Sequence, residues 1–365
     1  MRILHVIARM NVGGTATYLS GLISGQMERG DEVLLLTGSV PNGETEDLIL
    51  GDLPYIRIPS MSRKISVISD IKARSQIMKR IEDFQPDLVH SHTFKAGLLV
   101  RSIGLKVPVV HSFHGHHLVD PEFGLTKNAV LNLIEKLLCK RSSALIAIGE
   151  RVREELIEVG IGKSIRFVSI PPGIDELRLP NPDVIRRQLH LDVSAFVVMW
   201  LGRFTLVKRP DLVVEVARLL PEMTFVMAGG GELFETVRAI APKNVVLCGY
   251  RDRNEMWAIA DVALCTSDSE GMPLSLIEAQ LCGVPVVSRD VGSVSEILED
   301  GSTGTLTGNT AENLMTGLDK VRSMIDSNPD LASYAIARAR EKFSIAVMVN
   351  AHQELYKEVL REFGK

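Results

Sequence analysis

Two glutamates, Glu270 and Glu278, frame the segment E-G-M-P-L-S-L-I-E. The apolar run 262–264 before it predicts a buried strand. Pro273 suits the first turn of a following helix, because its missing N–H would be unpaired there anyway, and Gly283 suits the position just past the helix end. Free N–H groups and the helix dipole at such an N-terminus attract an anion such as a phosphate. Carboxylates on either side can accept hydrogen bonds from hydroxyls, so the segment predicts a site for a diphosphate with a sugar at each end.

Two cations, Arg203 and Lys208, stand five residues apart in the loop that follows the predicted strand 195–201. Arginine offers a bidentate fork and lysine a point charge, which is the usual pair for phosphate oxygens. An isolated R-x4-K is more often a solvated basic loop. Here the loop lies at the carboxyl end of a strand, in the same half of the chain as Glu270, and this position favours phosphate binding.

Two glycine-rich turns also follow predicted strands. The run 229–231 allows close backbone approach, either to a ligand or for packing alone. Gly13 and Gly14 resemble a nucleotide-binding turn but lack the third glycine of G-x-G-x-x-G. No acidic residue closes the second strand as ribose recognition in a dehydrogenase requires, which argues against that class. A flexible turn at the mouth of a cleft remains the interpretation of this segment.

Four histidines occur within seven residues: His111, His114, His116 and His117. Gly115 in a strand-to-loop turn would aim their rings apart, so we expect no metal site there. We expect His111 to belong to a strand and His114, at its carboxyl end, to face a cleft. His90 and His92, at the end of the preceding predicted strand, are expected either to line the cleft or to be structural, and the sequence assigns them no further role.

Composition excludes several classes of protein. The 365 residues are 45% hydrophobic and 24% charged with a net charge of -4, which is typical of a globular chain. Aromatic residues make up 5%, too few to suggest stacking platforms for nucleic acid. Four scattered cysteines predict neither a disulfide framework nor a zinc ribbon. Segment 2–8 is too short for a signal peptide, and no apolar run approaches the roughly 20 residues of a membrane span, so we expect a cytoplasmic protein.

A basic stretch covers residues 61–80, with isoleucines at roughly helical spacing, and a second basic run covers 127–141. Such stretches either lie on an anionic membrane surface or form ordinary surface helices, and the sequence leaves both open. The basic residues of the first stretch are Arg63, Lys64, Lys72, Arg74, Lys79 and Arg80.

Short β-branched runs alternate with helical patterns throughout, which predicts an α/β fold with parallel sheets. The Pro-rich segment 171–182 predicts a linker. We expect two Rossmann-like doubly wound domains facing across a cleft, 1–175 and 176–346, with a C-terminal helix, 347–365, packing back on the first. The strands should be almost continuously apolar. They are predicted at 3–7, 32–37, 55–58, 88–91, 107–112, 144–148, 166–170, 195–201, 224–228, 245–247, 262–265 and 284–288.

With these motifs in order, the chain resembles glycosyltransferase family 4, whose members are retaining enzymes of the GT-B architecture. Segments 89–97 and 111–116 further resemble bacterial members that build exopolysaccharide or surface glycans on polyprenyl-linked acceptors. The resemblance implies a hexosyl- or N-acetylhexosaminyl-transferase with a nucleotide-sugar donor, UDP being the commonest base in the family. It also allows peripheral contact with the inner face of the membrane, and it implies no nucleic-acid partner.

The resemblance also implies roles for individual residues. Arg203 and Lys208 would hold the diphosphate, Glu278 the ribose and Glu270 the transferred sugar, while His114 would lie beside the anomeric centre. Arg209 stands where relatives carry a small residue. The implied catalytic residues are His114, Glu270, Arg203 and Lys208. The implied donor-binding residues are Gly13, Gly14, Arg203, Lys208, Arg251, Gly271, Met272, Pro273, Leu274 and Glu278.

No D-x-D motif for a metal occurs in the chain. Arg203, Lys208 and the predicted helix N-terminus can neutralise a departing diphosphate instead, so we expect no metal or other cofactor. Two alternatives remain open: a nucleotide-sugar 2-epimerase on the same scaffold, against which the E-x7-E element argues, and a non-catalytic nucleotide-sugar-binding protein.

Overall fold

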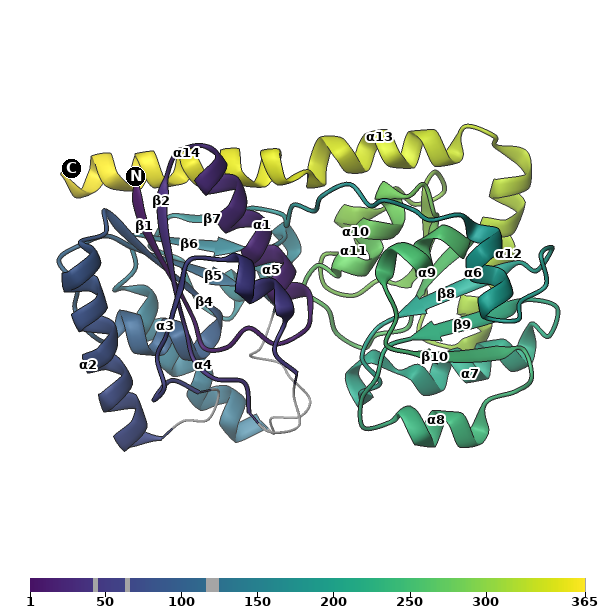
Figure 1. Cartoon of the computed structure of the whole chain (residues 1–365), viewed down its shortest axis with the longest axis horizontal. Coiled ribbons are helices and arrows are strands. Elements are labelled where there is room, and N and C mark those ends of the chain that lie inside the picture. The colour runs from purple at the N-terminus through teal and green to yellow at the C-terminus, as the bar shows by residue number, and fades with distance from the viewer. Residues whose placement is uncertain (42–44, 63–65, 116–124, 365) are drawn as a thin grey trace. The chain divides into compact units, whose positions relative to one another are not determined.

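The computed structural model describes residues 1–41, 45–62, 66–115 and 125–364 (Figure 1). The chain divides into two compact units, Met1–Asp175 with Phe343–Lys365, and Glu176–Lys342. The crossing between Asp175 and Glu176 lies in the proline-rich segment that the sequence singles out. The chain returns to the first unit at Phe343, a few residues before the expected Val347, because the Phe343 carbonyl accepts a 2.8 Å hydrogen bond from the backbone N–H of Ile174.

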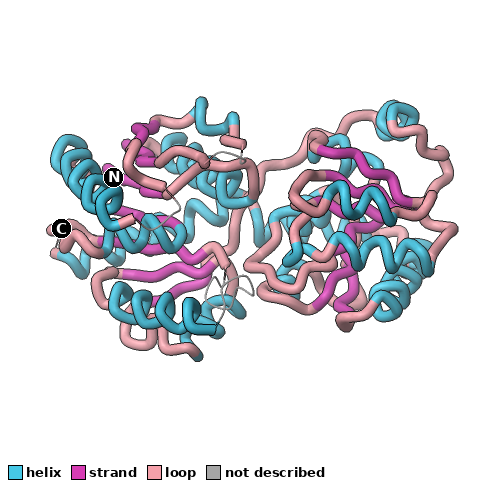
Figure 2. The backbone as a smooth tube through the Cα atoms, turned by 90° about the horizontal axis from the view of Figure 1, so that it is seen from below, coloured by secondary structure: helices cyan, strands magenta, loops and turns pink. Residues whose placement is uncertain are grey.

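The first unit is built on a seven-stranded parallel sheet in the order β3-β2-β1-β4-β5-β6-β7. Helices flank its strands (Figure 2). Its strands are β1 (Arg2–Ile7), β2 (Glu32–Thr37), β3 (Tyr55–Arg57), β4 (Leu88–His92), β5 (Val109–Phe113), β6 (Ala144–Ala147) and β7 (Phe167–Ser169). Its helices are α1 (Gly14–Glu28), η1 (Leu48–Asp52), α2 (Val67–Phe84), α3 (Thr93–Arg101), α4 (Leu125–Cys139), α5 (Glu150–Glu158) and α14 (Ile345–Phe363).

The second unit holds a six-stranded parallel sheet in the order β10-β9-β8-β11-β12-β13. Its strands are β8 (Val197–Leu201), β9 (Thr224–Ala228), β10 (Val245–Gly249), β11 (Val262–Cys265), β12 (Val286–Arg289) and β13 (Gly304–Thr307). Its helices are α6 (Pro182–Gln188), η3 (Leu206–Lys208), α7 (Pro210–Leu219), α8 (Phe234–Ile240), α9 (Arg253–Ile259), α10 (Leu274–Leu281), α11 (Val294–Ile297), α12 (Ala311–Ser327) and α13 (Leu331–Phe343). Two doubly wound parallel sheets are the predicted fold class.

The strands of the second unit are largely apolar and buried, as expected for strands covered on both faces. In the first unit, strands β4 and β5 depart from that expectation, because they bury His90, His92, His111 and Ser112 completely. Period-2 alternation places Val89 in the apolar layer beneath α2 and α3, and His90 on the opposite face. Both faces of this sheet therefore carry buried polar side chains: His90, His92 and Ser112 on one face, and Ser91 with His111 on the face toward α3.

Helix α14 packs on α1, as Figure 1 shows, so the C-terminal helix does return to the first unit. A methyl group on Gly25 of α1 would come within 2.7 Å of Val349, so the glycine permits the close approach. Tyr18 of α1 hydrogen-bonds His352 of α14 at 3.0 Å. None of the helices in the described ranges has the length and apolar composition that crossing a bilayer requires.

Candidate active site

The loop after β11 leads into α10, as the sequence predicts, but the helix starts one residue later than expected. Pro273 has an extended conformation (φ -70°, ψ 117°) and caps the helix, which begins at Leu274. At the other end Gly283 adopts a φ of +75°, and its N–H bonds the Gln280 carbonyl at 3.0 Å. This left-handed position is the one that favours glycine after a helix. Helix α10 is thus a short, well-terminated element.

Free donors gather at the start of α10. In the described part of the chain, no backbone carbonyl accepts from the N–H groups of Gly271, Met272, Leu274 or Ser275. The helix dipole adds partial positive charge at the same end. The α10 N-terminus therefore has the donors and the field that suit an anion.

Glu270 is held at one oxygen only. Its Oε1 accepts from Lys208 Nζ at 2.5 Å and from Ser267 Oγ at 2.6 Å. Its side chain is 8% exposed. No described residue donates to Oε2, so the carboxylate is fixed in place by one oxygen while the other retains its capacity to accept.

A neighbouring turn clamps the backbone of this loop. Gly292 has a φ of +50°, and a Cβ there would lie 2.0 Å from the Glu270 carbonyl oxygen. The Ser293 N–H donates to the Gly271 carbonyl at 2.8 Å. The sequence interpretation missed this turn, although an isolated V-G-S after a strand is a turn signal.

Lys208 and Arg203 belong to one loop but differ in environment. Lys208 is half-buried, its ammonium pairs with Glu270, and its carbonyl accepts from Thr266 Oγ1 at 2.8 Å. Arg203 is exposed and makes no ion pair within the described residues. The structure therefore joins Lys208 to Glu270, whereas the sequence paired it with Arg203.

Arg209 caps α7 with a φ of +50°. Its guanidinium bonds Asp211 at 2.8 Å and lies 3.6 Å from Asp268. Asp211 thus neutralises the extra charge at the position where the family resemblance leads one to expect a small residue, while Asp268 is shared with Arg289.

A small pocket opens beside these groups at the carboxyl ends of β8 and β11. Polar groups of Lys208, Glu270, Ser267 and Ser275 share it with apolar side chains. Its lining residues are Trp200, Leu201, Gly202, Lys208, Leu264, Cys265, Ser267, Glu270 and Ser275. A parallel sheet binds ligands at this edge.

Glu278 is 4% exposed and lies outside that pocket's lining. Burial raises the pKa of its carboxyl group, and Arg253 and Trp257 oppose the rise. Arg253 donates to Oε1 at 2.7 Å and the Trp257 indole N–H to Oε2 at 3.0 Å. Arg251, which the family resemblance assigns to the donor base, lies 3.7 Å from Glu255. The sequence interpretation missed Arg253 and Trp257, because it could not tell which of two nearby arginines turns inward.

The glycine run 229–231 has a packing role. A Cβ on Gly229 would meet the Gly202 carbonyl oxygen at 1.9 Å, and one on Gly231 the Phe204 carbonyl oxygen at 2.6 Å. The Phe204 N–H also bonds the Gly230 carbonyl at 2.9 Å. The contacts thus show close packing of this turn on the Arg203 loop, and a ligand contact by the same glycines stays a prediction.

Four of the residues predicted from the sequence belong to the first unit. Gly13 precedes α1 with a φ of +149°, which favours glycine, and both Gly13 and Gly14 are exposed. His111 lies in β5 as predicted. His114 follows that strand, is half-buried, and has its Nε2 3.2 Å from His92 Nδ1. His116 and His117 lie outside the described residues, as do Arg63 and Lys64.

Sequence comparison agrees with the architecture of both halves. Residues 12–178 match Glycosyltransferase Family 4, and residues 182–342 match Glycosyl transferases group 1. The chain belongs to glycosyltransferase family 4. The transferase is 28% identical over 274 residues to the UDP-Gal:alpha-D-GlcNAc-diphosphoundecaprenol alpha-1,3-galactosyltransferase of Escherichia coli, covering 68% of this chain and 70% of that one. It is 23% identical to the O-antigen biosynthesis glycosyltransferase WbnH of Escherichia coli, covering 96% and 97%.

Solved structures share the whole fold of this glycosyltransferase. Sucrose-phosphate synthase from Thermosynechococcus elongatus superposes with a TM-score of 0.86 at 18% identity, covering 99% of this chain and 100% of that one. HepE from Anabaena, solved in complex with UDP and glucose, gives a TM-score of 0.83 at 20% identity, covering 98% and 100%. Two Rossmann-like domains of the GT-B type are therefore confirmed.

Proposed function

We propose that this transferase moves a hexosyl or N-acetylhexosaminyl group, with retention of configuration, from a UDP-sugar to a glycan or polyprenyl-linked acceptor in surface polysaccharide biosynthesis. One observation carries the proposal: a lysine, a carboxylate with one uncommitted oxygen and the unpaired N–H groups at the α10 N-terminus meet at one sheet edge. A diphosphate flanked by sugar hydroxyls offers the complementary groups.

In this proposal the diphosphate lies against the α10 N-terminus. Lys208 and Arg203 neutralise the charge that grows on the leaving phosphate, and fixed donors do so without reorganising during the reaction. Glu270 accepts a hydroxyl of the transferred sugar through Oε2, while Lys208 and Ser267 hold its Oε1. Glu278, oriented by two donors, accepts from the ribose.

The first unit would supply the acceptor side. Gly13 and Gly14 would approach the diphosphate or acceptor, and His114 the sugar near its anomeric centre. The named relatives act on a diphosphoundecaprenol-linked sugar and in O-antigen biosynthesis. These names support a lipid-linked or glycan acceptor for this chain.

The donor is tested by calorimetry with UDP-, GDP- and ADP-sugars. We expect UDP-sugars to bind and Glu270→Gln or Lys208→Ala to weaken them, with Arg238→Ala, an exposed residue of α8, as the control. Equal binding of all three donors to the wild type, or none, would contradict the nucleotide assignment. Conversion of the donor sugar to its epimer without acceptor would favour the epimerase, and binding without slow donor hydrolysis a non-catalytic protein.

Catalysis is proposed to need no metal, because cations and helix N–H groups can perform the neutralisation and the chain has no D-x-D motif. Transfer should survive EDTA. Complete loss in EDTA, restored by magnesium, would overturn this part.

Membrane contact at the inner face of the cell membrane is the last part of the proposal. Helix α2 exposes Val67, Ile68 and Ile71 at 74%, 71% and 61%, with Lys72 and Lys79 also exposed. Apolar side chains beside lysines suit an anionic bilayer surface.

The membrane test is flotation with vesicles of phosphatidylglycerol and phosphatidylcholine. We expect weaker binding in Ile68→Ser/Ile71→Ser and in Lys72→Gln/Lys79→Gln. Lys243→Gln, an exposed lysine of the second unit, is the matched control. Unchanged binding in both double variants would leave α2 an ordinary surface helix.

A further inference from the structure

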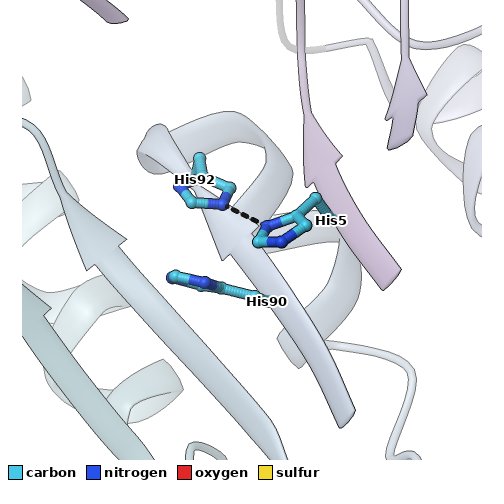
Figure 3. Close-up of side chains that lie close together, drawn as sticks. All are labelled: His5, His90 and His92. Carbon is cyan, nitrogen blue, oxygen red and sulfur yellow. Dashed lines mark hydrogen bonds between the residues drawn. The ribbon is translucent and has the colours of Figure 1, made fainter. Parts of the chain in front are cut away.

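A buried polar chain crosses the first unit on the sheet face covered by α1 and α14. Register places His5 of β1 beside His90 of β4, and His92 beside Ser112 of β5. Figure 3 shows the three imidazoles of His5, His90 and His92 together, with His5 and His92 joined by a hydrogen bond. The helices add four fully buried partners. These are Tyr18, Gln26, His352 and Tyr356.

The ligand atoms of His5, His90 and His92 lie within 4.8 Å of one another, a spacing that a metal ion would allow. Each of the six ring nitrogens, however, is already within hydrogen-bonding distance of a protein group. Their partners are His92, Gln26, Tyr356, Ser112, His5 and His114. An ion would have to break several of these bonds in a dry core, so we assign the cluster to a hydrogen-bond network.

The rings in this network are neutral. Burial lowers the pKa of His5 and of His352 to about 4, and holds the pKa of His90 and His92 well below 6.5. A neutral imidazole has one N–H donor and one acceptor nitrogen. Each neutral ring therefore couples its two hydrogen bonds: if one nitrogen must donate, the other must accept.

One branch of the network is directed by a backbone carbonyl, which can only accept. Met348 O lies 2.8 Å from His352 Nδ1, so that nitrogen carries the proton. His352 Nε2 then accepts from the Tyr18 hydroxyl at 3.0 Å. A second branch centres on His90, whose Nε2 lies 2.7 Å from the Ser112 hydroxyl and whose Nδ1 lies 2.6 Å from the Tyr356 hydroxyl. A hydroxyl can donate or accept, so this branch has no fixed direction.

A third branch starts at Gln26 and leads to His92. The Gln26 Oε1 atom lies 2.8 Å from His5 Nε2. An amide oxygen can only accept, so His5 carries its proton on Nε2 and its Nδ1 is an acceptor. The Gln26 amide nitrogen has no hydrogen-bond partner among the described groups.

The last two steps reach the predicted site histidine. His5 Nδ1 accepts from His92 Nε2 at 2.9 Å, and His92 Nδ1 accepts from His114 Nε2 at 3.2 Å. We propose that this directional chain sets the tautomer of His114, with the proton on Nε2 and the acceptor lone pair on Nδ1. Gln26, His5 and His92 are then positioning residues that act through His114.

The consequence for transfer rests on the proposed function. A His114 with the lone pair on Nδ1 accepts a hydrogen bond from a sugar hydroxyl through that nitrogen, and cannot donate from it while neutral. The hydrogen-bond chain would thus populate the acceptor tautomer of His114 before substrate binds, so that no free energy is spent on changing the tautomer during binding.

The test is long-range 15N–1H correlation NMR on the full chain labelled at histidine, near pH 7.5. It reads which nitrogen of each neutral ring carries the proton. We expect Nε2–H for His5, His92 and His114, and Nδ1–H for His352. A neutral His114 with its proton on Nδ1 would overturn the proposal, and this measurement needs no variant.

Variants then test the positioning claim. In Gln26→Leu the anchor for His5 is lost, so His114 should become a mixture of tautomers and transfer should fall about fivefold. Gln26→Glu keeps an oxygen toward His5 and should keep Nε2–H at His114. Gln280→Leu is the matched control, because Gln280 is an equally buried glutamine of the second unit that bonds the Val284 and Thr303 carbonyls. An unchanged His114 tautomer in a folded Gln26→Leu protein would refute the positioning role.

The two proposals fail separately. The NMR readout requires neither donor nor acceptor, so it stands even if this site performs another reaction. Conversely, wild-type transfer in His114→Ala would remove His114 from the proposed function and leave the tautomer assignment untouched.

Discussion

Two regions of the molecule hold their polar side chains in different ways: the sheet face beneath α1 and α14 in the first unit, and the α10 end of the sheet in the second. The first region buries neutral imidazoles, phenols and an amide in a hydrogen-bond network, whereas the second holds charged pairs, Lys208 with Glu270 and Arg253 with Glu278. The first unit also buries a charged pair, Arg101 with Glu135, but that pair joins α3 to α4 outside this network. A neutral network needs every proton in its place, whereas a charged pair needs only opposite signs, although each ion loses its hydration on burial. The first region is therefore suited to orientation and the second to electrostatic stabilisation.

The largest expected difference between the two units is in how acid changes their free energy of unfolding. Because the folded pKa of His5 and His352 is about 4 and the unfolded value about 6.5, the unfolded chain binds more protons between these limits. The first unit should therefore lose about 1.4 kcal/mol per pH unit for each histidine as pH falls through that window. The folded pKa of Glu278 is raised above its ordinary value of 4.5. As pH falls through the range just above 4.5, protonation of this carboxyl group therefore increases the free energy of unfolding of the second unit.

Urea titrations at pH 7, 6 and 5 measure this difference. Both tryptophans of the chain, Trp200 and Trp257, lie in the second unit, so fluorescence reports that unit while circular dichroism reports the whole chain. Equal loss of stability by both probes would break the comparison.

Removing the lysine of the charged pair should have the next largest effect. Lys208→Ala deletes a fixed donor to the leaving diphosphate and should lower turnover on the order of 100-fold. Arg203→Ala is expected to act similarly, although Arg203 is exposed. Arg238→Ala serves as a control, measured by the same transfer assay. Wild-type turnover in Lys208→Ala would show that the charged pair is structural.

The backbone clamp on Glu270 can be tested with a pair of glycines. Gly292→Ala and Gly301→Ala both place a side chain at positive φ, which costs about 1–2 kcal/mol. Only Gly292 has an atom, the Glu270 carbonyl oxygen, within 4 Å of the new Cβ. We expect a further loss of stability and reduced donor affinity in Gly292→Ala alone. Equal stability in urea titration and equal donor affinity in calorimetry for the two variants would show that Gly292 does not hold the Glu270 backbone in place.

The smallest predicted effect is a difference in the stability lost when each of the two indole N–H donors is removed. Trp257→Phe removes a donor to the Glu278 carboxylate and should cost about 1.5–3 kcal/mol, while Trp200→Phe removes a donor to the Thr266 hydroxyl and should cost about 0.5–1.5 kcal/mol. Urea unfolding followed by the remaining tryptophan measures each. A larger loss in Trp200→Phe would argue that the charge on Glu278 adds nothing to its bond.

Most of the fold could be predicted, because alternating apolar runs leave a local signature. Strands β2, β9 and β11 have both predicted bounds. Strand β13 was missed, since Gly304-Thr-Leu-Thr is short and lacks a β-branched apolar run. Histidines in β4 and β5 contradict the expectation of continuously apolar strands. The burial of His90 is possible because α14 brings the Tyr356 hydroxyl to it, whereas His111 on the opposite face bonds Ser91.

The sequence predicted which residues belong to the candidate site, but not which of them contact each other. Glu270 and Lys208 were both expected in it, yet their direct contact was not. Arg251 and Arg253 are two residues apart, and only the turn of the chain into α9 directs Arg253 to Glu278.

What the sequence alone determined is the alternation that builds two parallel sheets and the polar residues placed where strands end. Both features depend on residues close together in the sequence and follow patterns that repeat every few residues. Only tertiary structure decided which donor meets which acceptor. Gln26, His5, His92 and Tyr356 come from four separate elements, and a proton's position on a ring depends on the partner across space, which no local pattern encodes.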